Sequence, residues 1–301
     1  MHIYILLPMR SLHTLLHGLI DYAGLFPPAE LGMPAAVASF GSYRAGEHCW
    51  ALGRFVLPAS RLPEFEAAAA PCLPVAGAPW KLAALAGPSL PADLGAIAEF
   101  NRRQTGRAIV DTVELKAGTP EAIAAALAAI DDQLDTYVEL PIAQDPAPLL
   151  AELARRGGRA KVRTGGVTAD AFPAPADLLR FLRRSLEAGV PFKATAGLHH
   201  PLRGAYRLTY QPDSACATMF GFLNLFLAAA FLEHGLGWAD ALALLEETAP
   251  EAFHFDDGGL SWRSHRLDET ELRHTRRRSA LAFGSCSFTE PIEDLQALGL
   301  L

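Results

Sequence analysis

Length, composition and charge limit what this chain can be. The 301 residues suffice for one large domain, and half of them are hydrophobic, so a sizeable core can form. The net charge of −7 at pH 7 argues against nucleic acid or an anionic membrane as the main partner. The four cysteines are scattered without the spacing of a metal site, which is typical of reduced thiols in a cytoplasmic protein.

Two apolar segments are poor candidates for membrane targeting. Residues Met1–Pro8 lack the basic region and cleavage site of a signal peptide, and we expect a first strand there or a translation start at Met9. The run Met219–Leu232 is too short for a membrane span, which needs roughly 20 apolar residues, and it contains Asn224. We expect it to be a helix that is buried or lies at a subunit interface, so a homo-oligomer without membrane association is predicted.

Short apolar runs alternate with Ala/Leu-rich stretches along the chain. The eight runs expected to be strands lie near residues 18–25, 54–57, 80–85, 108–115, 136–140, 160–164, 191–195 and 281–287. Helices with clear boundary residues are expected at 120–133, 146–156 and 176–188, the first capped by Thr119 and the others ended by glycine. This alternation predicts an α/β fold, a (β/α)8 TIM barrel as one domain over residues 1–301, with a doubly wound open sheet as the alternative.

One connection is much longer than the others. Residues 198–280, roughly 80 residues, separate the seventh and eighth strands, whereas such connections are usually short. Within it we expect two helices and a charged stretch at residues 262–279. We interpret the segment as a helical insertion within the barrel domain that acts as a lid or as an oligomer interface.

Two lysines end short apolar runs that then break into glycine. Lys161 and Arg163 share one face of their strand, and Lys193 and Thr195 share one face of theirs. If both faces point into the barrel, three cations converge and their repulsion lowers the pKa of a lysine toward neutrality. A neutral amine of this kind attacks a carbonyl carbon to form a Schiff base. The alternative is that each lysine is a solvated residue at a strand end.

Carboxylates lie at neighbouring strand ends. Glu114 and Glu139 occur in matching Val-Glu-Leu phrases, where they can balance the charge of the lysines or move protons. Asp111 lies three residues before Glu114, so only a β-bulge turns both of them inward. A structural layer of ion pairs is the alternative interpretation of these carboxylates.

Loop residues complete the candidate site. One of His199 and His200 is expected to contact substrate, and the backbone of the turn at 284–287 can bind phosphate or carboxylate. Cys286 in that turn is expected to be a small buried residue, because no histidine lies near it in the sequence. The residues expected to bind substrate are Asp21, Arg163, Thr164, Thr195, His199, His200, Gly284, Ser285 and Ser287.

In their order along the chain these pieces resemble the deoxyribose-phosphate aldolase family of class I aldolases. The similar phrases are Leu19-Ile20-Asp21-Tyr22, Arg54-Phe55-Val56-Leu57-Pro58, Val110-Asp111-Thr112-Val113, Lys161-Val162-Arg163-Thr164-Gly165, Phe192-Lys193-Ala194 and Phe283-Gly284-Ser285-Cys286-Ser287. The resemblance implies a barrel in which Lys161 forms the Schiff base, Lys193 lowers its pKa and Asp111 is the catalytic aspartate. Tyr22-Ala23 departs from the family's His-Thr, and the long insertion has no counterpart, so the resemblance supports the chemistry more than a particular substrate.

Three hypotheses follow. The first is a Schiff-base-forming, aldolase-type lyase without a cofactor, which acts on a small carbonyl compound with or without a phosphate or carboxylate group. Its catalytic residues are Lys161 and Lys193 with Asp111, Glu114 or Glu139 as the proton carrier. The second hypothesis is a divalent-metal enzyme that uses Glu114, Glu139 and His199. The third is a non-catalytic barrel that binds a metabolite or a partner.

Overall fold

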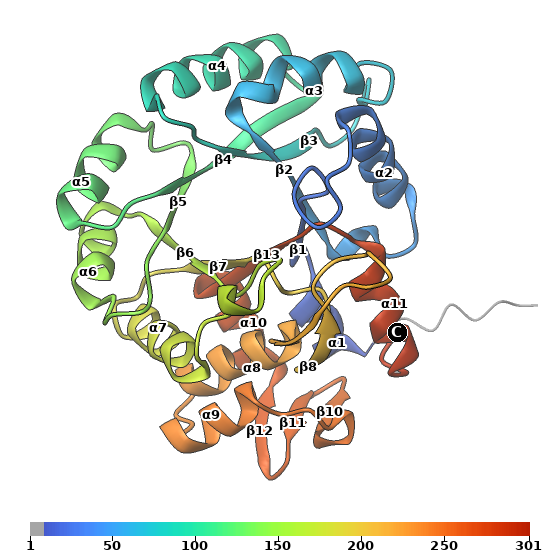
Figure 1. The fold of residues 1–301 in the computed structure, drawn as a ribbon, viewed down its shortest axis with the longest axis vertical. Helices are drawn as coiled ribbons and strands as arrows, with labels where there is room; N and C mark the ends of the chain where they lie inside the picture. The colour runs from blue at the N-terminus through green and yellow to red at the C-terminus, as the bar shows by residue number, and fades with distance from the viewer. Residues whose placement is uncertain (1–8) are drawn as a thin grey trace, which may run out of the picture.

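Eight parallel strands close into a barrel (Figure 1). A computed structural model describes residues 9–301, so the expectation for Met1–Pro8 lies outside the described residues. The strands are β1 (Ile20–Tyr22), β2 (Leu52–Pro58), β3 (Trp80–Leu85), β4 (Ala108–Lys116), β5 (Asp135–Glu139), β6 (Arg159–Arg163), β7 (Phe192–Thr195) and β13 (Ala280–Ser285). Their order around the barrel is β1-β13-β7-β6-β5-β4-β3-β2. The predicted (β/α)8 barrel is confirmed, and the open-sheet alternative is wrong.

Helices form the outer layer of the barrel (Figure 1). They include α1 (Arg10–Leu16), α2 (Met33–Ala45), α3 (Leu62–Ala69), α4 (Leu90–Arg103), α5 (Pro120–Ala129), α6 (Ala147–Arg156), α7 (Pro175–Glu187) and α11 (Thr289–Ala297). Short 3-10 helices span Cys49–Ala51, Ala59–Arg61, Ala169–Ala171 and Pro250–Ala252. The three helices expected from boundary residues are present. Thr119 caps α5 by accepting a hydrogen bond from the Ala122 N–H, and Gly157 ends α6 with a φ of 70°.

The long connection between β7 and β13 contains strands as well as helices. Its elements are β8 (Gly204–Arg207), β9 (Cys216–Met219), α8 (Phe222–Glu233), α9 (Trp238–Leu245), β10 (Phe253–Asp256), β11 (Gly259–Trp262), β12 (His265–Asp268) and α10 (Glu269–Arg278). Strands β8 and β9 form a hairpin, and β10–β12 form a separate antiparallel sheet beyond α8 (Figure 1). The insertion was expected to be helical, and it is helical only in part. The charged stretch at its end forms strand β12 and then helix α10.

Helix α8 is buried within its own chain. Ten of its twelve residues are buried, and it packs against α7, α9, α10 and β13. The polar residue of this apolar run, Asn224, accepts a hydrogen bond from the Arg203 N–H and donates to the carbonyls of Leu244 and Glu247, each at 2.8 Å. The buried alternative for Met219–Leu232 is thus confirmed. Because the helix offers no exposed apolar face, it gives no support to the predicted homo-oligomer.

The strand register places the charged residues side by side. Lys161 on β6 lies opposite Lys193 on β7 and also opposite Glu139 on β5. Glu139 in turn lies opposite Lys116 on β4. The pairing of β3 with β4 shifts by one residue at Asp111, because Leu82 lies opposite Val110 whereas Ala83 lies opposite Thr112. The β-bulge that the alternation argument required is therefore present.

The described part of the chain has no helix that is both long enough and apolar enough to span a bilayer.

Candidate active site

The two lysines are joined by one carboxylate. Lys161 Nζ lies 2.8 Å from Glu114 Oε2, and Lys193 Nζ lies 2.6 Å from Glu114 Oε1. All three side chains are almost completely buried, with relative exposures of 6% for Lys161 and 2% for each of the other two. Glu114 thus divides its two oxygens between two ammonium groups, an arrangement that the sequence spacing did not reveal.

Two further carboxylates complete what we call the lysine cluster: Asp21, Glu114, Glu139, Lys161 and Lys193. Lys193 Nζ lies 2.5 Å from Asp21 Oδ2, and Asp21 Oδ1 accepts a hydrogen bond from the Arg54 N–H at 2.7 Å. Lys161 Nζ lies 3.1 Å from Glu139 Oε2, a buried oxygen that has no hydrogen-bond partner among residues 9–301. The cluster therefore alternates carboxylate and ammonium groups across the barrel.

The other oxygen of Glu139 faces outer cations. Its Oε1 lies 3.3 Å from Lys116 Nζ and 3.4 Å from Arg163 Nε. Both of these cations are more exposed than the lysine cluster, with relative exposures of 72% and 46%. Glu139 therefore connects the buried lysines to the solvent-facing rim of the barrel.

These contacts fix the charge states inside the cluster. Burial alone would raise the pKa of Glu114, but the attraction of Lys161 and Lys193 outweighs it and lowers the pKa to about 2. The pKa of Glu139 is also lowered, because Lys161, Arg163 and Lys116 outweigh its burial. Burial alone would lower the pKa of Lys193, but Asp21 and Glu114 outweigh it and raise that pKa above its ordinary value. The expectation that converging cations lower a lysine pKa is therefore wrong for Lys193, since the interleaved carboxylates dominate.

Three members of the lysine cluster, Glu114, Lys161 and Lys193, line a cavity of about 210 Å³. Glu114, Lys161, Arg163, Lys193 and Thr195 all line it, so the face that Lys161 shares with Arg163 and the face that Lys193 shares with Thr195 both point inward. The cavity is also lined by Ala23, Phe26, Pro27, Val56, Leu85, Gly166, Val167, Ala196, His199, Gly284 and Cys286. These residues follow the carboxyl ends of the strands, which is where barrel enzymes carry their active sites.

Asp111 lies with a different set of charges. It accepts two hydrogen bonds from the Arg54 guanidinium, at 2.6 and 3.1 Å, and lies 3.6 Å from Lys81 Nζ. Asp135 and Arg159, each the first residue of its strand, form an ion pair beside Arg54. We call Arg54, Lys81, Asp111, Asp135 and Arg159 the arginine cluster. Its place near the amino ends of the strands separates Asp111 from both lysines, so the structure brings Glu114 and Glu139, and not Asp111, to them.

Thr164 holds two loops together beside the cavity. Its side chain is fully buried, and its Oγ1 donates a hydrogen bond to the Ala196 carbonyl at 2.5 Å. Ala196 and Gly197 both have positive φ values, 62° and 72°, and a Cβ on Gly197 would lie only 2.9 Å from Gly165 Cα. Thr164 therefore fixes a strained segment of the wall, a positioning role that differs from the substrate contact expected of it.

The serine hydroxyls of the turn after β13 are used within the protein. Ser285 is buried, and its Oγ accepts a hydrogen bond from the Ser287 N–H at 3.3 Å. Ser287 Oγ accepts a hydrogen bond from the Glu290 N–H at 3.1 Å, which satisfies a backbone donor in the first turn of α11. Gly284 alone of these three candidate residues lines the lysine cavity. Anion binding by this turn stays a prediction.

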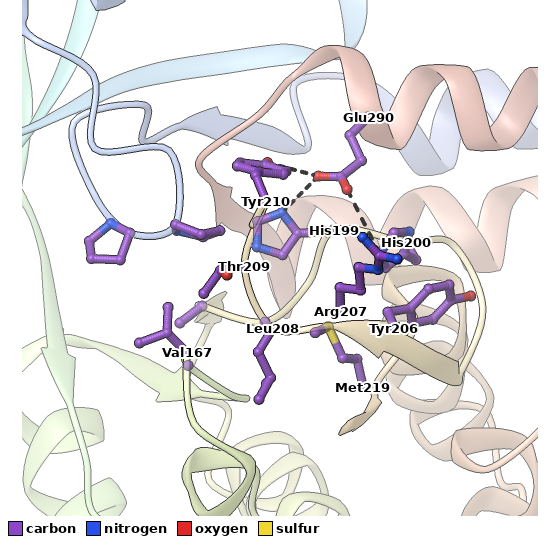
Figure 2. Close-up of a pocket in the computed structure, with 15 residues that line it drawn as sticks. Val167, His199, His200, Tyr206, Arg207, Leu208, Thr209, Tyr210, Met219 and Glu290 are labelled. Carbon is purple, nitrogen blue, oxygen red and sulfur yellow. Dashed lines mark hydrogen bonds and ion pairs between the residues drawn. The ribbon is translucent and has the colours of Figure 1, made fainter. Parts of the chain in front are cut away.

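A second ionisable group lies at the wall of the cavity (Figure 2). His199 Nδ1 lies 3.1 Å from Glu290 Oε2, and the Tyr210 hydroxyl donates to the same oxygen at 3.1 Å. Cys286 Sγ lies 3.9 Å from His199 Nδ1 and 3.4 Å from the Tyr210 hydroxyl. Cys286 is buried as expected, but a histidine does lie near it in space. His200 Nδ1 instead pairs with Asp294 at 2.6 Å.

His199 also borders an outer cavity of about 320 Å³ that the β8–β9 hairpin covers. Tyr206, Arg207, Leu208 and Tyr210 of the hairpin segment line it (Figure 2). The inner and outer cavities share Pro27, Gly166, Val167, Ala196 and His199 as lining residues. The long insertion thus contributes one wall of the candidate site, beside the carboxyl ends of the strands.

Sequence reasoning missed Glu290 and Tyr210. In the sequence, Glu290 belongs to the start of the last helix. Its one notable feature there is that it is an acidic residue in the first helical turn. Nothing in the sequence marks Tyr210, because its place depends on how the β8–β9 hairpin folds over the barrel.

Between residues 9 and 301, the structure contains no group of at least three His, Cys, Asp or Glu side chains that could hold a metal ion. Glu114 and Glu139 contact lysines, and His199 contacts Glu290. Comparisons of the chain with models of protein families, with curated proteins and with solved structures find no match.

Proposed function

We propose that this protein is a Schiff-base-forming lyase of the aldolase type, with Lys161 as the nucleophile. The observation that carries the proposal is the pair of buried lysines, in register on adjacent strands and bridged by Glu114 at the floor of a cavity. Burying two lysines costs stability unless carboxylates compensate, so a barrel that needed only packing would place apolar side chains here.

Contact strength distinguishes the two lysines. Lys193 is held by two carboxylate oxygens at 2.5 and 2.6 Å and has a raised pKa, which keeps it as an ammonium group. Lys161 has longer contacts, 2.8 and 3.1 Å, and lies beside a Glu139 oxygen that accepts no hydrogen bond within the described part of the chain. Lys161 is therefore the lysine that can release a proton with the least rearrangement, and Lys193 holds Glu114 in place.

The reaction follows from these positions. Lys161 Nζ loses one proton through Glu139 Oε2, and Glu139 passes that proton to solvent at the rim of the barrel and is ionised again. The lone pair of Lys161 Nζ then adds to the carbonyl carbon of the substrate. Loss of water gives a protonated imine, which takes up the electron pair released when the adjacent C–C bond breaks. Glu139 or Glu114, both ionised at neutral pH, accepts the proton of the substrate hydroxyl. The same carboxyl group returns its proton to the carbon atom of the resulting enamine, and hydrolysis of the product imine then frees Lys161.

The two cavities offer the substrate spaces of different size. An inner cavity of about 210 Å³ suits a carbonyl compound of a few carbon atoms at Lys161. The adjoining outer cavity gives space for the remainder of a longer molecule. Arg163 at the inner rim and Arg207 in the outer cavity favour a substrate that carries a carboxylate or phosphate group.

Borohydride trapping tests the proposal. The protein is incubated with small aldehydes, ketones and keto acids, reduced with borohydride and analysed by intact and peptide mass spectrometry. We expect one covalent adduct, on Lys161, whose mass identifies the carbonyl compound. An adduct on Lys193 would exchange the roles of the two lysines, and the absence of any adduct would overturn the proposal.

A further inference from the structure

His199 lies where the inner and outer cavities meet, and it lines both of them. Its Nδ1 is held by Glu290, which comes from the first turn of α11, 91 residues along the chain. Tyr210 of the hairpin segment fixes the same carboxylate oxygen. The ring is therefore oriented by two separate elements, although its own side chain is on a loop.

This orientation leaves the other ring nitrogen for the cavity. Within residues 9–301, no hydrogen bond or ion pair involves His199 Nε2. Figure 2 shows this second nitrogen on the side of the ring away from Glu290, facing the hollow that Val167 lines. A histidine whose Nδ1–H donates to a carboxylate presents Nε2 as the functional atom.

The surroundings keep the ring protonated. Burial alone would lower the pKa of His199, but hydrogen bonds to Cys286 and Glu290 outweigh it and raise the pKa to about 9. Glu290 is correspondingly held as a carboxylate, because His199 lowers its pKa against the effect of burial. The other ionisable groups around the two cavities are Glu114, Lys161, Arg163, Lys193, His200, Tyr206, Arg207 and Tyr210.

The lysine cluster contains no comparable acid. Glu114 and Glu139 have lowered pKa values, so they are ionised at neutral pH and have no proton to donate. Lys193 has a raised pKa, and its ammonium group is committed to Asp21 and Glu114. Imine formation nevertheless needs a proton donor for the departing oxygen, and efficient donors have a pKa near the working pH.

We propose that His199 is the general acid of the lysine reaction and that Glu290 and Tyr210 are its positioning residues, an inference that rests on the proposed Schiff-base function. In the step, the Lys161 nitrogen lone pair forms the C=N bond while the C–O bond of the carbinolamine breaks. The oxygen leaves with that electron pair and takes the proton from His199 Nε2, which produces water. When water later attacks the product imine, His199 takes a proton back.

The test measures imine formation as a function of pH. Wild-type protein is mixed with acetaldehyde between pH 6 and 10, quenched at timed intervals with excess borohydride, and the adduct is quantified by mass spectrometry. The wild-type rate should fall as pH rises through about 9, where His199 loses its proton. His199→Gln should trap about 100-fold more slowly at neutral pH and lack this fall. Glu290→Gln should shift the fall to lower pH, because the Glu290 carboxylate helps to raise the pKa of His199.

A matched histidine–glutamate pair provides the control. His234 Nδ1 lies 3.6 Å from Glu271 and borders neither cavity, so His234→Gln should leave the rate and its pH dependence unchanged. If wild type is trapped and His199→Gln is trapped equally fast, the acid role is overturned while the Schiff-base function stands. If wild type is never trapped, both are overturned. Should His199→Gln fail to fold, an unshifted profile in Glu290→Gln would overturn the inference, and a shifted one would support it.

Discussion

The barrel interior contains two clusters of charges with different chemistry. The lysine cluster lies at the carboxyl ends of the strands and lines a cavity, whereas the arginine cluster lies near the amino ends and its charges pair with one another. Tyr137 separates them, with Lys193 Nζ 5.4 Å and the Arg159 guanidinium carbon 5.5 Å from its ring centre. Asp21 connects them, because one oxygen pairs with Lys193 and the other accepts the Arg54 N–H.

The choice of cation explains the difference. Arginine stays protonated in proteins and binds a carboxylate with a rigid fork, so Arg54 and Asp111 make a lasting structural pair. Lysine can lose its proton and become a nucleophile when its surroundings change. We therefore propose that the arginine cluster stabilises the barrel and that the lysine cluster carries the chemistry, and each of the following changes tests that division.

The largest effect is expected from replacing the proposed nucleophile. Lys161→Arg keeps a positive charge beside Glu114 and Glu139, so the fold should persist while the amine is lost. We expect no adduct in borohydride trapping and a thermal unfolding midpoint close to that of wild type. Lys81→Arg in the arginine cluster is the matched control and should trap normally. A Lys161→Arg protein that still formed the wild-type adduct would refute the assignment.

Removing the shared carboxylate should cost stability in a pH-dependent way. Glu114→Gln leaves Lys161 and Lys193 without their common partner and should lower the free energy of unfolding at pH 7 by about 3 kcal/mol. The wild-type pKa of about 2 lies below the ordinary 4.5, so this contribution is complete above pH 4.5 and disappears as pH falls through about 2.

The measurement is denaturant unfolding of wild type and Glu114→Gln between pH 2 and 7. The difference between the two proteins should shrink toward the acid end. Glu121→Gln, which alters an exposed carboxylate at the start of α5, should have the same free energy of unfolding as wild type at every pH. A constant difference at every pH would contradict the ion-pair account.

The arginine cluster should affect stability without affecting trapping. Arg54→Met should lower the free energy of unfolding by about 2 kcal/mol, less than Glu114→Gln, because Lys81 remains beside Asp111. The hydrogen bond to Asp21 comes from the Arg54 backbone and is retained. Adduct formation on Lys161 should therefore continue at the wild-type rate. Loss of trapping in a folded Arg54→Met protein would show that the two clusters are one functional unit.

The smallest effect is expected at the cavity wall. The pKa of His199 is raised from 6.5 to about 9, so its pairing with Glu290 stabilises the fold fully below pH 6.5 and is lost as pH rises through about 9. Glu290→Gln should cost about 1 kcal/mol at pH 6 and almost nothing at pH 10. Denaturant unfolding at the two pH values measures this, and an equal cost at both would contradict the charged pair.

Much of the fold was predictable because its signals are local. Most barrel strands are built around apolar residues. Helix α5 begins after its cap Thr119, and α6 ends at Gly157. The alternation of side chains along a strand placed Lys161 on one face with Arg163 and Lys193 on one face with Thr195, and the structure shows that both faces point inward. The mixed structure of residues 198–280 was not predictable in the same way, because its short strands lack a strong apolar pattern.

The sequence by itself determined the barrel and the placing of two lysines on neighbouring strands. Both follow from local patterns, because the periodicity of apolar residues marks each strand and strands that are consecutive in sequence usually lie side by side. The tertiary structure decided the electrostatics. A bulge directs Asp111 toward Arg54, Glu114 divides its oxygens between the lysines, and Glu290 meets His199 across 91 residues. A pKa depends on which charges lie within a few ångströms of a group, and the number of residues between two groups in the sequence does not give the distance between them in space.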